Sequence, residues 1–404
     1  MLKMLDVKKT ERFRLAGELI EQAYRHVEMD VPPIVVQDAN YSLAGEAPGT
    51  VPADYFDEGA FSSVLAHQGK KITAHLEQFT DQYIPFLFPW YGTGVVPSAL
   101  GCDILFQPDE EPAVRGAIMS LPEEIKRLVP PDPQRDGLMP RVLRCIDYLR
   151  ANSDLPVSFT DCQGPFNIAL NLVGLETICL WMYDCPNVVH ELMDFCTTVL
   201  IDWVKVQKQH AGQELESGAF PHFVALPKGH GGVWISDDDC TVISPDLYRR
   251  FVVPYNSRVF RAFGGGTLHY CGTATHQFEN FLATDGLNGI NNWCMGDFDQ
   301  VFRAQELFEG RIVLMVDDYA PLDIEGYYSR LIADLKLKGV ILTVFPAWSL
   351  ATVGRRTETH HRDGAQVGQH AWRVIHEQLR KRRAASFSMP GFATADAETR
   401  PTGR

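Results

Sequence analysis

Apolar residues follow two spacings along this chain. Short apolar runs predict buried strands, and longer segments with an apolar residue every three or four positions predict amphipathic helices. The strand-length runs are residues 34–38, 157–161, 223–226 or 233–235, 267–270, 289–292, 312–316 and 340–345. The helical segments are residues 9–28, 61–80, 138–152, 168–181, 187–210, 246–263, 276–284, 299–308 and 322–337.

Strands that alternate with helices imply right-handed βαβ units and a parallel sheet. Seven or eight such units can be drawn along the chain. We therefore predict an α/β fold, a (β/α)₈ TIM-type barrel with an N-terminal helical extension. A doubly wound open sheet is the alternative, but no strand is followed by GxGxxG and no GxxxxGK[ST] is present.

One domain, residues 1–383, is expected to hold the barrel. The segment 384–404 is small, polar and proline-containing, which predicts a disordered tail. A formal net charge of −14 argues against nucleic acid or an anionic membrane surface as the main partner, because phosphates would be repelled. An anionic small-molecule substrate remains compatible with this net charge, since a local cluster of Arg can override the overall field.

The cysteines indicate a reducing compartment. There are 9 of them, an odd number without a repeated spacing, and the first residues show no apolar signal segment. These features favour a cytoplasmic protein with reduced thiols. The longest apolar stretches have strand length, so no membrane-spanning segment is expected.

Polar residues stand at the carboxyl ends of the predicted strands, where barrels of this kind place their reactive groups. We take Asp38, Asp161 and Asp237 as candidate catalytic acids at the mouth of the barrel. The candidate substrate-binding residues are Gln163, Asn167, Asn291 and Asp317. For each Asp, and for Gln163 and Asn167, a helix-capping or turn role is the alternative.

His269 and Cys271 form a separate candidate site. Residues two apart on a strand point to the same face, so the imidazole and the thiol should converge. A thiolate and an imidazole are preferred zinc ligands, and Gly272 allows the chain to turn directly afterwards. The alternative is a strand-end His beside an inert buried Cys. Cys294 closes the next predicted strand and is the candidate third ligand, with the pair Asp317 and Asp318 as the fallback.

Three motifs resemble the uroporphyrinogen decarboxylase-like superfamily. The stretch DCQGPFNIALNLVGLETICLWMYDCPNVVHELMD (161–194) is similar to its GPF…YDxPxxVHEL segment. ISPDLYRRFVVPYNSRVF (243–260) is similar to its SPxxYxxFxxPY helix, and LHYCG (268–272) to its HxCG. The resemblance runs from about Ala99 to about Val353. It implies a (β/α)₈ barrel and, commonly, a homodimer.

The resemblance points to two branches of the superfamily. The decarboxylases carry an Arg-rich N-terminal motif that residues 1–60 lack, and they need no metal. In the corrinoid methyltransferases the HxC supplies two zinc ligands, and the zinc activates an acceptor thiol. A third Cys of that branch lies in a PGCG-like turn, whereas the matching region here reads LTVFPAW (342–348). The third ligand must then be Cys294 or an acid, or zinc is absent.

The leading hypothesis is therefore a zinc-dependent methyltransferase that moves a methyl group between a corrinoid on a partner protein and a small acceptor. A metal-free decarboxylase of a tetrapyrrole or another acidic substrate is the second hypothesis. The third is a barrel that binds a corrinoid or a small ligand without catalysis.

Overall fold

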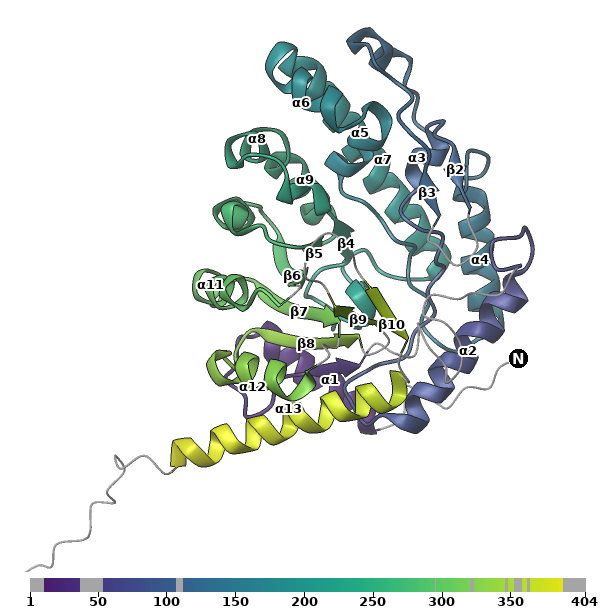
Figure 1. The fold of residues 1–404 in the computed structure, drawn as a ribbon. Helices are drawn as coiled ribbons and strands as arrows, with labels where there is room; N and C mark the ends of the chain where they lie inside the picture. Colours follow the sequence, from purple (N-terminus) through teal and green to yellow (C-terminus); the bar gives the residue numbers. More distant parts are fainter. Residues whose placement is uncertain are drawn as a thin grey trace, which may run out of the picture.

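A six-stranded parallel sheet lies at the centre of the structure, a computed structural model (Figure 1). The model describes residues 11–36, 54–106, 112–294, 296–319, 323–345, 348–351, 358–361 and 364–387. The strand order is β1-β8-β7-β6-β5-β4, so the first strand pairs with the last and the sheet curves into a ring. The strands are β1 (Ile34–Val36), β4 (Val233–Ser236), β5 (Gly266–Cys271), β6 (Leu287–Trp293), β7 (Val313–Tyr319) and β8 (Val340–Phe345).

Two extended segments occupy the remaining positions of the ring. Leu87 forms an isolated parallel bridge with Val157, and Gln163 forms another with Ser236 at the end of β4. The segment around Leu87 and the segment from Val157 to Gln163 thus stand where an eight-stranded barrel has its second and third strands. The predicted α/β fold of the TIM-barrel type is confirmed, with strand pairing weakest on this side.

Helices surround the strands, as Figure 1 shows. They are α1 (Glu11–Tyr24), α2 (Phe61–Gln78), α3 (Val95–Ala99), α4 (Met139–Asn152), α5 (Pro165–Val173), α6 (Leu175–Asp184), α7 (Pro186–Ala211), α8 (Pro245–Phe251), α9 (Val253–Ala262), α10 (Phe278–Leu282), α11 (Phe298–Phe308), α12 (Ile324–Asp334) and α13 (Gly364–Phe387). There are also two small antiparallel sheets, β2 (Ile104–Leu105) with β3 (Ala113–Val114) and β9 (Trp348–Ala351) with β10 (Glu358–His361).

Two helices expected to be continuous are interrupted. The segment 168–181 divides between α5 and α6 at Gly174, whose φ of +84° does not fit a right-handed helix. The segment 246–263 divides at Val252, two residues before Pro254, because proline lacks the N–H that a continuing helix needs. Helix α13 extends to Phe387 and so includes the first residues of the segment 384–404. Residues 388–404 lie outside the described part.

Within the described residues, no single helix is long and apolar enough to cross a membrane. Together α5 and α6 reach that length and composition, but they are bent by 103° at their junction.

Asp81 ties β1 to the weakly paired side of the barrel. Its carboxylate is buried and accepts hydrogen bonds from the backbone N–H of Val36 (2.7 Å) and the guanidinium of Arg12 (3.1 Å). Nε2 of His75, also buried, lies 3.0 Å from the same carboxylate. The Asp81 carboxylate therefore connects the end of β1 with α1 and α2.

We expect Asp81→Ala to lower the free energy of unfolding by about 3 kcal/mol, because it leaves buried donors without an acceptor. Urea unfolding followed by circular dichroism measures this. The matched control is Asp285→Ala, which removes an exposed pair with Arg261 and should cost at most about 0.5 kcal/mol. Equal losses in the two variants would contradict this role of Asp81.

Candidate metal centre

His269 and Cys271 lie on the inward face of β5. Leu268 and Tyr270 point the other way, and the hydroxyl of Tyr270 donates to Gln300 of α11 at 3.2 Å. Because side chains alternate along a strand, the two chemical groups share one face. Cys271 Sγ lies 3.4 Å from His269 Nε2. Gly272 follows with φ +87°, a left-handed conformation in which the chain leaves the strand.

Asp238 supplies a third donor atom to this pair. It follows β4 in the 3₁₀ turn η5 (Asp238–Thr241). Its Oδ1 lies 3.9 Å from His269 Nε2 and accepts a hydrogen bond from the backbone N–H of Cys271 at 2.7 Å. One oxygen, one nitrogen and one sulfur thus lie within 4.8 Å of one another. Such a donor set suits a borderline-soft cation such as Zn²⁺.

Cys294, the candidate third ligand, is not brought to this cluster. In the register of β5 and β6, Asn291 pairs with His269 and Trp293 pairs with Cys271, so these residues face inward. Cys294 comes next and falls on the opposite face. It is 1% exposed, and its Sγ lies 3.8 Å from the hydroxyl of Tyr327 on α12.

Asp237, a candidate catalytic acid, also faces away from the barrel interior. Its Oδ2 accepts hydrogen bonds from the hydroxyl of Tyr248 (2.5 Å) and from Nδ2 of Asn256 (3.0 Å), which belong to α8 and α9. Burial raises the pKa of Asp237 to about 7. The neighbouring Asp238, one position further along the alternation, is the acid that points to His269.

The other predicted residues at this end of the barrel have separate contacts. Asp161 is half-buried near the end of the extended segment from Val157 to Gln163 and lies outside the donor cluster. Gln163 Oε1 accepts from Nδ2 of Asn171 at 2.5 Å. Nδ2 of Asn167 donates to Asp239 at 2.9 Å. The contacts of Gln163 and Asn167 are thus with residues of α5 and η5, which indicates a structural role. Asp38 lies outside the described residues.

Asn291 and Asp317, by contrast, do join His269. Nδ1 of His269 lies 2.5 Å from Oδ1 of Asn291, and Nδ2 of Asn291 donates to Oδ2 of Asp317 at 3.3 Å. An amide oxygen only accepts, so the proton of the neutral imidazole is assigned to Nδ1. The lone pair of Nε2 therefore faces Cys271 and Asp238, the tautomer that a metal ligand needs.

His222, like Asp238, is a site residue that sequence reasoning missed. It lies in the short turn η4 (Pro221–Phe223). The sequence predicts a strand at residues 223–226 or at residues 233–235, and the structure forms it at the second position, as β4. Its ring stacks on that of His269 with centroids 3.9 Å apart and planes at 20°. Its Nδ1 lies 3.2 Å from Oδ2 of Asp317. A lone His in a loop carries no spacing signal that would have revealed this contact.

Burial controls the protonation of this group of residues. It lowers the pKa of His269 and of His222 to about 4, so both rings are neutral at pH 7. Burial also raises the pKa of Asp317 to about 7. The pKa of the Cys271 thiol is raised by burial and then by the Asp238 carboxylate. A bound cation would reverse the effect on the thiol, because it stabilises the thiolate.

The chain is thus a TIM-type parallel barrel with a His, Cys and Asp cluster at the carboxyl ends of its strands. The family model described as uroporphyrinogen decarboxylase (URO-D) matches residues 87–215. A uroporphyrinogen decarboxylase of Xanthomonas campestris pv. campestris (strain B100) is 22% identical over 233 residues, which cover 54% of this chain and 59% of that protein. One from Xylella fastidiosa (strain Temecula1 / ATCC 700964) is 22% identical over 180 residues, covering 43% of this chain and 45% of that protein.

A solved structure, a methyltransferase from Methanosarcina mazei, matches with a TM-score of 0.60 and 15% identity over 91% of this chain and 98% of that one. At this identity the match concerns the fold. The aligned region spans 59% of the length of the first curated relatives. Together with the sequence motifs, the family-model match and the curated relatives show a similarity to the uroporphyrinogen decarboxylase-like superfamily.

Proposed function

We propose that this protein is a zinc-dependent methyltransferase that moves a methyl group between a cobamide, carried by a partner protein, and a small thiol-type acceptor. The observation that carries the proposal is the convergence of Asp238 Oδ1, His269 Nε2 and Cys271 Sγ within 4.8 Å. These three residues would hold the metal. Three protein donors are the number found in catalytic zinc sites, which keep a fourth position for a substrate.

The surroundings of the donors fit a metal ion. Asn291 holds Nδ1 of His269 at 2.5 Å, which leaves Nε2 as a ligand atom, and the backbone N–H of Cys271 fixes Asp238 at 2.7 Å. Bound zinc supplies one kind of chemistry here: it lowers the pKa of an acceptor thiol so that the thiolate is available near pH 7. The protein's own residues orient the ligands and keep both imidazoles neutral.

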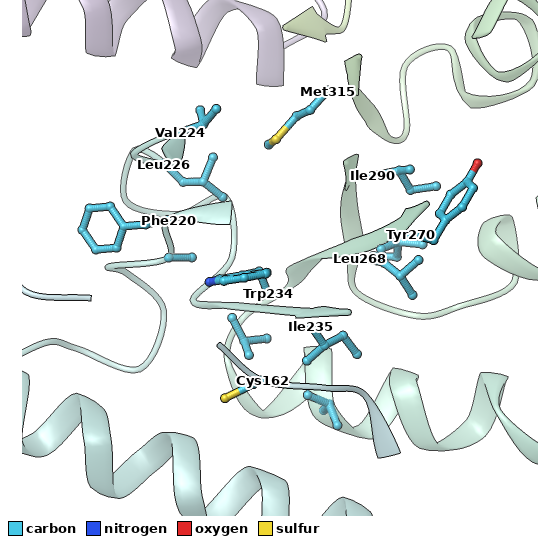
Figure 2. Packing of buried hydrophobic residues seen from close by; sticks show 14 of the residues in the cluster. Cys162, Phe220, Val224, Leu226, Trp234, Ile235, Leu268, Tyr270, Ile290 and Met315 are labelled. Atoms are coloured by element: carbon cyan, nitrogen blue, oxygen red, sulfur yellow. The ribbon is translucent and has the colours of Figure 1, made fainter. Parts of the chain in front are cut away.

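A small acceptor is supported by what occupies the barrel interior. The segment Ala219–Leu226, which carries His222, packs aromatic rings against the extended segment around Leu87: Phe220 stacks on Phe86 with centroids 4.3 Å apart. Phe223 meets Phe88 edge-on at 6.1 Å. Figure 2 shows Phe220, Val224 and Leu226 in the same part of the core as Trp234 and Met315. The ring of His222, on the same segment, covers one face of His269 with centroids 3.9 Å apart, and this favours a small acceptor over a tetrapyrrole.

Metal-free decarboxylation of a porphyrinogen or another acidic substrate is the second candidate. The match of residues 87–215 to the uroporphyrinogen decarboxylase model favours it. In that case Asp238 and Asp317 would stabilise positive charge on a protonated substrate, and the convergence of His269 and Cys271 would have no metal-binding task.

Elemental analysis of the purified full chain separates the two candidates. We expect about one zinc per chain and methyl transfer from a methylated cobamide to a small thiol, with no release of carbon dioxide from uroporphyrinogen under anaerobic conditions. A folded protein that lacks zinc and does not take it up from a buffered zinc solution would eliminate the methyltransferase proposal. Carbon dioxide release by such a protein would establish the second candidate.

A further inference from the structure

We propose that His222 is a positioning residue of the metal centre, which holds the imidazole of His269 so that Nε2 faces Cys271 and Asp238. This inference rests on the metal site proposed above. His222 does not belong to the donor cluster of Asp238, His269 and Cys271, but its contacts include the ring of His269 and Asp317, which accepts from Asn291. It therefore acts on the metal through another residue.

The contacts of His222 close a cycle around His269. The ring of His222 covers the face of His269 at 3.9 Å, and Asn291 holds the edge of His269 at 2.5 Å. Oδ2 of Asp317 then joins the other two members, because it accepts from Asn291 at 3.3 Å and lies 3.2 Å from Nδ1 of His222. A ring held on one face and one edge has little freedom to rotate about its side-chain torsions. Its metal-binding nitrogen is thus oriented before a metal arrives.

The segment Ala219–Leu226 holds His222 in this position. Its two ends are joined by a hydrogen bond from the N–H of Leu226 to the carbonyl of Ala219 at 3.1 Å. His222 and Phe223 have left-handed backbones, with φ of +39° and +66°. Non-glycine residues rarely adopt this conformation, so surrounding contacts must hold the turn in this shape. The stacking of Phe220 on Phe86 at 4.3 Å is one of these contacts.

The effect of His222 on His269 can be measured without a metal. In metal-free protein labelled with ¹⁵N-histidine, nitrogen chemical shifts report which ring nitrogen carries the proton, and His269→Ala identifies the signal. We expect a single Nδ1–H tautomer of His269 in the wild type and a mixture of tautomers in His222→Ala. A Co²⁺ titration of the same proteins, followed by visible absorption, should show an affinity about 10- to 100-fold weaker in His222→Ala.

His222→Phe keeps a flat ring in the core. It replaces His222→Ala in both measurements if His222→Ala does not fold. It loses the contact with Asp317, so we expect a smaller loss of Co²⁺ affinity, of severalfold. The matched control is His190→Ala: His190 also stacks on a ring, that of Phe251 at 4.7 Å, and bonds Tyr255 at 2.9 Å, but it lies on α7. It should leave the tautomer of His269 and the Co²⁺ affinity unchanged.

A wild-type tautomer together with wild-type Co²⁺ affinity in both His222 variants would overturn the inference. Failure of the proposed function looks different, since the wild type itself would then bind neither Co²⁺ nor zinc. The tautomer of His269 in the metal-free variants would still decide the role of His222 in that case.

Discussion

Cys271→Ala is expected to weaken zinc binding by roughly 10³-fold or more, since each ligand carries several kcal/mol of the binding free energy of a zinc site. The thiolate is the softest of the three donors, and removing it leaves only Asp238 and His269. Competition with a chromophoric chelator measures the affinity, and methyl transfer should be lost in parallel. Because the side chain is at the strand end and becomes smaller, we expect the fold to be retained by circular dichroism.

Two neighbours provide matched controls for this prediction. Cys294→Ala removes a thiol that closes the adjacent strand but lies against Tyr327 on the outer face, so it should leave zinc affinity unchanged. Asp238→Asn should weaken zinc binding by about 10-fold or more, since an amide is a poorer zinc ligand than a carboxylate. Asp237→Asn should not, because Asp237 contacts Tyr248 and Asn256 instead. If Cys294→Ala lost zinc and Cys271→Ala kept it, the assigned ligand set would be wrong.

Lys208→Met is expected to stabilise the protein by roughly 2 to 4 kcal/mol at pH 7. Lys208 of α7 is fully buried, and among the described residues no carboxylate forms an ion pair with it. Its Nζ donates to the carbonyl of Ser217 and lies 5.3 Å from the ring centroid of Phe159. Burial lowers the pKa of Lys208 from 10.5 to about 7. Methionine matches its unbranched shape without a charge to bury.

The stabilisation expected from Lys208→Met depends on pH. Between pH 7 and pH 10.5 the unfolded chain keeps the proton on Lys208 while the folded chain releases it, so wild-type stability rises with pH in this window. The advantage of Lys208→Met should therefore be largest at and below pH 7 and vanish near pH 10.5. Urea unfolding at a series of pH values measures both. Lys205→Met, on the same helix but on its exposed side, should change stability by at most about 0.5 kcal/mol. A constant difference between wild type and Lys208→Met across this range would refute the explanation.

Parts of the site followed from strand alternation alone. The convergence of His269 and Cys271 needs only two residues on one strand, and the distance of 3.4 Å agrees with it. The same rule also predicts the direction of Cys294: if Asn291 faces His269, then Cys294, three positions on, must face outward. Assigning both Asn291 and Cys294 to one site conflicted with the alternation, and the register of β5 with β6 resolves that conflict.

Other parts could not be found in this way. Asp237 and Asp238 are adjacent acids, and which of them points inward depends on where β4 ends and on its register with β5. The extended segment around Leu87 forms a single bridge within a loop-rich stretch and is too short for a periodic pattern. His222 reaches His269 because a loop packs on Phe86, a contact between residues far apart in the chain.

The sequence by itself determined the alternating helices and strands, hence the barrel, and the inward pair His269 and Cys271. Both depend on periodicity over a few residues, which is a local property of the chain. Only the tertiary structure decided that Asp238 is the third donor and that His222, Asn291 and Asp317 enclose His269. These contacts depend on strand register and on the path of a loop, and long-range packing sets both.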